Sequence, residues 1–216
     1  NWNAGQLSGW TIASNNLGAG VPWQIKASGA GASTSIVGDG TNFIEAVPGF
    51  SSSNTTTTLT SPVFSTVGYS AATLTYNQYF GATAGDVQVA VQISTNSGSS
   101  WTTLFDQTGT SQVISSWSVG TPQKTISIPS GALGLSTVRL RWIYNSTAGN
   151  FWTLDNIAVK GNSNISYAWT GMSGATGLSC TPCSTNTITP AAAGANLYTV
   201  VATAANGCTS GTLVAV

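Results

Sequence analysis

Apolar and polar residues alternate along most of the chain, which predicts β-strands rather than helices. In residues 87–94, Val or Ile at every second position is separated by Gln, Ala and Ser. Val138–Tyr144 repeats this pattern, with Arg139 and Arg141 on the polar face. No stretch shows the i, i+3, i+4, i+7 apolar spacing of an amphipathic helix. We therefore predict an all-β protein.

The alternation changes phase in one strand near the middle of the chain's second half. Trp152 and Leu154 share one parity, whereas Ile157 and Val159 share the other. A one-residue slip turns every later side chain to the opposite face of a sheet. A β-bulge at Asp155-Asn156 keeps all four apolar side chains on one face. The pattern thus predicts a carboxylate at a bend beside an apolar core, a costly position for an unpartnered charge.

Turn residues divide the rest of the chain into further short strands. The Ser/Thr tract from Ser51 to Thr58 is interpreted as a polar loop. Asn96 and Gly98 are predicted to supply left-handed backbone at a hairpin turn, from which Trp101 folds back against the sheet. The other predicted strands of this region are 9–12, 21–25, 42–47, 59–64, 72–80, 101–105 and 123–129.

Charge is unusually rare. The 216 residues include five Lys plus Arg, five Asp plus Glu and no His, or 5% charged residues against roughly 25% in ordinary soluble proteins. A net charge of zero gives no electrostatic footprint for nucleic acid or an anionic membrane. Eight Trp, six Tyr and six Phe argue against disorder. A hydroxyl- and amide-rich composition of this kind favours an extracellular location.

An ordered series of short motifs gives a resemblance to a known family. The series is Gly9-Trp10, Leu59-Thr60-Ser61-Pro62, Ser94-x-Asn96-x-Gly98-x-x-Trp101, the basic-apolar strand Val138–Tyr144, and Trp152-x-Leu154-Asp155-Asn156-Ile157-x-Val159. It resembles the MAM-like or cleaved-adhesin jelly rolls of secreted proteins from gliding, type IX-secreting bacteria. The resemblance covers about residues 1–161 and implies a two-sheet jelly-roll sandwich.

Residues 162–216 are predicted to form a second, smaller domain. Strands are expected at Tyr167–Trp169, Leu197–Thr203 and Thr212–Val216, with a hairpin turn at Asn206-Gly207. The segment resembles the small Ig-like or PKD-like repeats that follow such jelly rolls, but about 55 residues are too few for a whole Ig sandwich of roughly 100. We expect its exposed sheet to be covered by the jelly roll, by further chain, or by a strand from a neighbouring copy, which would build a filament.

No catalytic constellation is recognisable. Without His, a Ser or Cys nucleophile would need help from Lys or a carboxylate, and no spacing provides it. A glycosidase needs a carboxylate pair, and nothing singles out two among Asp39, Glu45, Asp86, Asp106 and Asp155. We therefore predict that the chain is not an enzyme.

A structural Ca²⁺ is implied for Asp155 by the resemblance. In related carbohydrate-binding jelly rolls, the Asp of the last strand joins an early Glu and backbone carbonyls around the ion, and oxygen ligands at a bulge suit Ca²⁺. The family's early Phe-Glu is missing here, so Glu45 is the candidate substitute. The competing interpretation is that Asp155 caps backbone N–H groups of the bulge.

Aromatic side chains are the candidate sugar-stacking groups. Trp10, Trp142 and Trp152 occupy strand positions typical of a core. The candidates for a ligand-binding role are Trp23, Trp101, Trp117 and Tyr79. For each of them a core position is the favoured interpretation, because aromatic residues dominate cores.

The three cysteines predict one disulfide and one remaining thiol in an oxidising compartment. A zinc site would need four ligands, and a thioredoxin-like site would need a βαβ context. A bridge from Cys208 to Cys180 or Cys183 would staple the short second domain, but the sequence leaves the pairing open.

These observations predict an extracellular, cell-surface protein with an adhesive or structural role, whose partners are surface glycans or other copies of itself. The alternative is a carbohydrate-binding module of a larger secreted polysaccharide-active enzyme. A self-assembling subunit is included in the first hypothesis.

Overall fold

The computed structural model describes residues 2, 7–15, 21–31, 39–47, 55–80, 86–108, 124–146, 151–204 and 207–216. Its contacts divide the chain into two compact units. The first unit comprises Asn1–Thr66 and Ala72–Lys160, and the second comprises Val67–Ala71 and Gly161–Val216. Where a domain boundary falls remains a prediction from the sequence.

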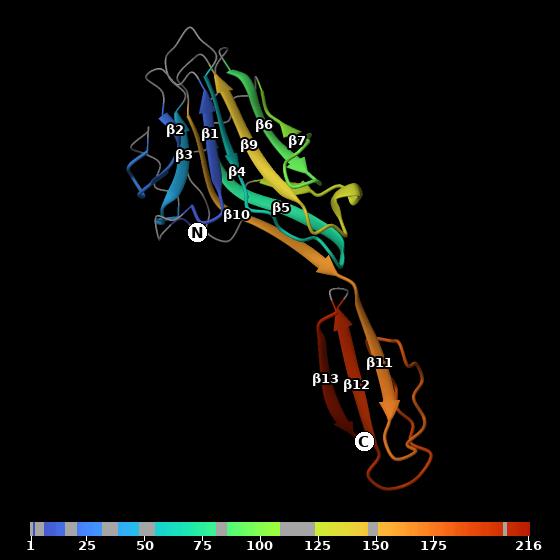
Figure 1. Ribbon diagram of the computed structural model, residues 1–216. Helices are drawn as coiled ribbons and strands as arrows, with labels where there is room; N and C mark the ends of the chain where they lie inside the picture. The colour runs from blue at the N-terminus through green and yellow to red at the C-terminus, as the bar shows by residue number, and fades with distance from the viewer. Residues whose placement is uncertain are drawn as a thin grey trace. The chain divides into compact units, whose positions relative to one another are not determined.

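Two five-stranded antiparallel sheets build the first unit (Figure 1). The first sheet has the order β1 (Thr11–Asn15), β4 (Thr55–Thr60), β9 (Arg139–Ser146), β6 (Asp86–Ser94), β7 (Thr102–Asp106). The second has the order β2 (Val21–Lys26), β3 (Phe43–Val47), β10 (Trp152–Ser163), β5 (Tyr69–Phe80), β8 (Lys124–Ser127). Apart from β2–β3 and β6–β7, neighbouring strands are not consecutive in the chain, as in a jelly roll, so the predicted all-β, two-sheet fold is confirmed.

Aromatic rings fill the space between these two sheets. Trp142 of the first sheet and Trp152 of the second are both fully buried. Tyr144 meets Trp152 edge to face with ring centroids 6.1 Å apart, and Tyr76 meets Trp142 in the same way at 5.9 Å. Such edge-to-face pairs add to the free energy gained from burying the rings. They join the sheets into one core.

The predicted change of phase in β10 is present. Trp152 and Leu154 belong to the central core, and Ile157 and Val159 pack against the same core. Asn156 between them has φ 52°, in the left-handed region that lets one extra residue bend a strand. The backbone turn at Asn156 therefore keeps all four apolar side chains on the inner face.

The Ser/Thr tract differs from the prediction. Thr55–Thr58 form part of β4 rather than a loop, and residues 51–54 lie outside the described residues. Thr55, Thr57 and Leu59 are buried, with half-buried residues between them. A β-branched Thr suits a pleated, half-buried strand, and β4 is paired on both sides, by β1 and β9. Pairing and burial thus outweigh the polarity of the hydroxyls.

The second unit contains a three-stranded antiparallel sheet, with the order β11 (Ile165–Gly171), β12 (Leu197–Ala204), β13 (Thr209–Ala215). Tyr198 is its fully buried anchor, and the Tyr198 hydroxyl donates to the Thr176 carbonyl at 2.6 Å. Its Ig-like or PKD-like character stays a prediction. In the described part of the chain the sole helical segment is the 3₁₀ turn Ser130–Ala132, and no helix there could cross a membrane.

Candidate functional sites

Two carboxylates meet beside the bend in β10. The Thr41 hydroxyl lies 2.6 Å from Asp39 Oδ1 and 3.3 Å from Asp155 Oδ2. Asn156 contacts both carboxylates, because its backbone N–H donates to Asp155 Oδ1 at 2.7 Å and its side-chain amide donates to Asp39 Oδ2 at 2.9 Å. Thr41 and Asn156 therefore hold two like charges close together.

Burial and the neighbouring charge act on the proton affinity of this pair. Burial, with the Asp39 charge adding in the same direction, raises the pKa of Asp155 from 3.8 to about 6, although the bonds from Asn156 and Thr41 oppose the rise. Burial also raises the pKa of Asp39, but hydrogen bonds from Asn156 and Thr41 outweigh it and leave that pKa lowered. Asp155 is thus an ionisable group whose charge is incompletely compensated.

The donors around this pair fit a hard cation. The two carboxylates and the Thr41 hydroxyl are all oxygen ligands, the type that Ca²⁺ prefers. Glu45, the other predicted ligand, is buried in β3 opposite Thr153. Within the described ranges no three His, Cys, Asp or Glu side chains gather as a metal-holding group. Hydrogen bonds through Thr41 and Asn156 therefore link Asp39 to Asp155.

A second cluster lies on the outer face of the first sheet. Arg141 of β9 pairs in register with Gln92 of β6, and its Nε donates to Gln92 Oε1 at 2.7 Å. The Gln92 amide lies 3.3 Å from the Thr103 hydroxyl of β7. The Arg141 guanidinium also lies over the half-buried Trp101 ring, 4.3 Å from its centroid. We call these four residues the Trp101 cluster; each member is held in place by another.

The hairpin before β7 positions Trp101. Asn96 Oδ1 accepts from the Ser100 N–H at 2.9 Å, and Ser94 Oγ accepts from the Gly98 N–H at 2.8 Å. The left-handed positions are Ser97 and Gly98, so the prediction that Asn96 would be one of them is wrong. Asn96 caps the turn with its side chain instead.

The other predicted ligand-binding aromatics are placed differently. Trp23 is 1% exposed, and its ring centroid lies 5.6 Å from that of Trp152. Trp23 is therefore a core residue that a ligand cannot reach, which corrects its prediction as a ligand-binding residue. Tyr79 is half-buried and stacks on Phe151 at 5.2 Å. Trp117 lies outside the described residues. Trp101 and Tyr79 thus remain accessible at two separate places.

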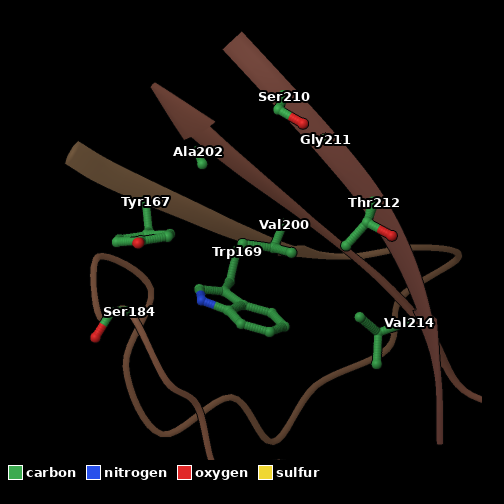
Figure 2. A pocket seen from close by; sticks show the side chains of 9 residues that line it. All are labelled: Tyr167, Trp169, Ser184, Val200, Ala202, Ser210, Gly211, Thr212 and Val214. Carbon is green, nitrogen blue, oxygen red and sulfur yellow. The ribbon is translucent and has the colours of Figure 1, made fainter. Parts of the chain in front are cut away.

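A groove opens on one face of the three-stranded sheet (Figure 2). Its volume is about 380 Å³. Trp169 lies within it, and the Trp169 indole N–H donates to the Cys183 carbonyl at 2.9 Å. The lining residues are Tyr167, Trp169, Ser184, Val200, Ala202, Ser210, Gly211, Thr212 and Val214. The groove reaches β13, the last strand of the sheet.

The structure joins Cys180 to Cys183, with a Cα–Cα distance of 5.6 Å. Cys208 lies outside this disulfide and is exposed. The bridge from Cys208 to Cys180 or Cys183 that the sequence suggested is therefore not formed, because Cys180 and Cys183 bond to each other.

Asp39 is the site residue that the sequence did not single out. It precedes β3 in an Asp-Gly-Thr turn, where its side chain accepts from the Thr41 N–H at 2.9 Å. It lies 117 positions before Asn156. The sequence shows the turn, but only the pairing of β3 with β10 brings Asp39 close to Asp155.

Comparisons with known proteins give similarity of fold. No protein-family model matches the chain, and the search of curated proteins finds no match. Solved structures do match. TmCBM61 in complex with β-1,4-galactotriose aligns with TM-score 0.48 and 11% identity, over 74% of this chain and 94% of that one. The K1 cleaved adhesin domain of Lys-gingipain from Porphyromonas gingivalis W83 aligns with TM-score 0.41 and 18% identity, over 71% of this chain and 99% of that one.

A third solved structure holds more than one module. The CBM22-1–GH10 modules of the Clostridium thermocellum xylanase 10B, complexed with xylohexaose, give TM-score 0.42 and 14% identity. The alignment covers 72% of this chain but only 26% of that chain. These neighbours are carbohydrate-binding modules and an adhesin domain.

Proposed function

We propose that the chain is an adhesive binding module of an extracellular surface protein, without catalytic activity, and that it binds a neutral glycan through the Trp101 cluster. The observation that supports this is the contact of indole, guanidinium and amide on one sheet face. A sugar presents an apolar ring face and hydroxyls that both donate and accept. Side chains already held in place bind such a ligand with little further loss of entropy.

The charge balance favours an uncharged ligand. Five basic and five acidic residues give the chain no net charge with which to attract a charged polymer. The same surface would serve the alternative role, a carbohydrate-binding module of a larger polysaccharide-active enzyme. The sequence context of the whole protein, rather than the glycan, separates these two roles.

Calorimetric titration of the full chain with a panel of neutral polysaccharides tests this proposal. We expect sub-millimolar binding to one of them, weakened about tenfold, or about 1.4 kcal/mol, by Trp101→Ala. Arg141→Lys should weaken it too, since Lys lacks the planar group that covers the ring. Tyr79→Ala removes an aromatic ring from β5 of the other sheet and is the control. An equal loss in Tyr79→Ala, or no binding at about 1 mM by any polysaccharide, would refute the proposal.

We also propose a structural Ca²⁺ at the Asp39–Asp155 pair. A divalent cation would offset the repulsion of two like charges that Thr41 and Asn156 hold together. It would stabilise the bend in β10 rather than contact the glycan.

Self-association is the second role that we propose, and it concerns the second unit. The three-stranded sheet ends in β13, a strand without a described neighbour on its outer side. Such an edge can accept another strand.

A further inference from the structure

The outer edge of β13 carries backbone N–H and C=O groups that point away from β12. Val216 and Asn196 exchange both backbone hydrogen bonds, at 3.0 and 2.9 Å. Antiparallel hydrogen bonding alternates along a strand, and the register of β12 with β13 shows no shift from Thr209 to Ala215. The groups that point away from β12 therefore belong to Thr209, Gly211, Leu213 and Ala215.

In the part of the chain that the structure describes, this edge lacks the usual protection. Natural edge strands avoid pairing through Lys, Pro, a bulge or a covering segment. The β13 sequence Thr-Ser-Gly-Thr-Leu-Val-Ala has no Lys or Pro and no register shift. The whole of 161–216 contains no Lys, Arg, Asp, Glu or His. At the other edge of the sheet, by contrast, β11 is partly covered, because the Trp169 N–H donates to the Thr181 carbonyl.

Among the described residues, nothing in its own chain requires residue 211 to be glycine. Its φ is not left-handed, and an added Cβ would meet Val200 O and Val201 Cγ2 at an ordinary 3.6 Å. A glycine inside a strand weakens it and often marks the close approach of another backbone. Two residues later, on the same face, Leu213 is 58% exposed. A gap and a protruding apolar side chain thus lie next to each other on this edge.

We propose that β13 pairs antiparallel with β13 of a second copy, about a two-fold axis through Thr212. This pairing sets Gly211 opposite Leu213 of the partner subunit, and Thr209 opposite Ala215 of the partner subunit, so that every outward backbone group gains a bond. On the other face Thr212 opposes its own counterpart. The Leu213 side chain then covers the gap over Gly211. The result is a six-stranded sheet.

Charge and register both select a second copy as the occupant. An uncharged edge offers no attraction to a charged peptide. A second copy, by contrast, supplies a Leu213 for each Gly211, because a two-fold axis makes the same contact twice. The inference rests on the self-association proposed above and is independent of glycan binding. A seven-residue strand is about 24 Å long, and its contact falls well below the roughly 800 Å² per partner of a stable complex. The dimer is therefore weak and forms where copies are concentrated.

Sedimentation of the full chain between about 1 µM and about 1 mM tests the proposal. We expect monomer at the lower end and dimer, but nothing larger, at the upper end. Gly211→Lys should abolish the dimer by placing a charge over the gap. Ala168→Lys puts the same charge in the same row of the sheet, at its other edge, and should leave the dimer intact.

Cross-linking checks the register. In a Cys208→Ser background, Thr212→Cys should oxidise to a covalent dimer, because the axis brings residue 212 beside itself. Ser210→Cys alone should not, but should cross-link when mixed with Val214→Cys. Equal cross-linking of Ser210→Cys alone, a monomer at every concentration, or an equal loss of dimer in Ala168→Lys overturns the proposal. Growth beyond a dimer overturns the closed pairing while leaving self-association in place.

Discussion

Asp155→Asn should stabilise the protein when Ca²⁺ is removed. The substitution keeps the size of the side chain and an oxygen that can accept the bond from the Asn156 N–H, while its amide nitrogen replaces Oδ2 beside the Thr41 hydroxyl, which can accept from it. It removes a fully buried charge that lies beside Asp39. A rise in pKa from 3.8 to about 6 corresponds to about 3 kcal/mol of unfavourable free energy for the ionised, folded state. Allowing for relaxation around the charge, we expect a gain of about 1–3 kcal/mol at pH 7.5.

The sign of the pH dependence follows from the same shift. Between pH 3.8 and about 6 the folded state holds the Asp155 proton more tightly than the unfolded state does. Stability from this group is therefore complete below pH 3.8 and is lost as the pH rises through about 6. Asp155→Asn should remove that loss.

Urea unfolding in EGTA at a series of pH values between about 4 and 7.5 measures both effects. Asp106→Asn, at an exposed carboxylate of the same unit, is the control. Added Ca²⁺ should reverse the order, because only a protein with both carboxylates gains binding free energy from the ion. The reasoning fails if Asp155→Asn lowers stability in EGTA, or if its pH profile matches that of the natural chain. An unchanged melting temperature on adding EGTA to the natural chain would exclude the ion.

Further outcomes are expected in the second unit. Without reductant, alkylation and peptide mapping should modify Cys208 but not the Cys180–Cys183 pair, and reducing this short-loop disulfide should cost no more than about 2 kcal/mol. Modification of all three thiols would contradict this. Gly161→Ala should cost about 1–3 kcal/mol in urea unfolding, because its Cβ would lie 2.7 Å from the Tyr69 ring. Gly211→Ala, where the Cβ has room, is its control; an equal loss in both would refute the packing argument.

The sequence by itself determined most of the strands and the side chains in them that face the core. Alternation at 138–144 reappears in β9, Val89, Val91 and Ile93 of β6 belong to the core, and the three C-terminal strands lie within a few residues of their predicted bounds. The change of parity between Leu154 and Ile157 located the bend in β10. These features are local, because a strand must place every second side chain on the same side. A short apolar pattern therefore fixes which residues face the core.

The tertiary structure alone decided which distant residues meet. Thr55 and Thr57 are strand residues because β1 and β9 pair on either side of them, and Trp23 is core because Trp152 packs against it. Asp39 reaches Asp155, and Cys180 takes Cys183 rather than Cys208, through turns whose position depends on strand pairing. The alternation of side chains along a strand does not indicate which other strand will pair with it. The carboxylate pair and the Trp101 cluster thus exist only once the strands have been ordered into sheets.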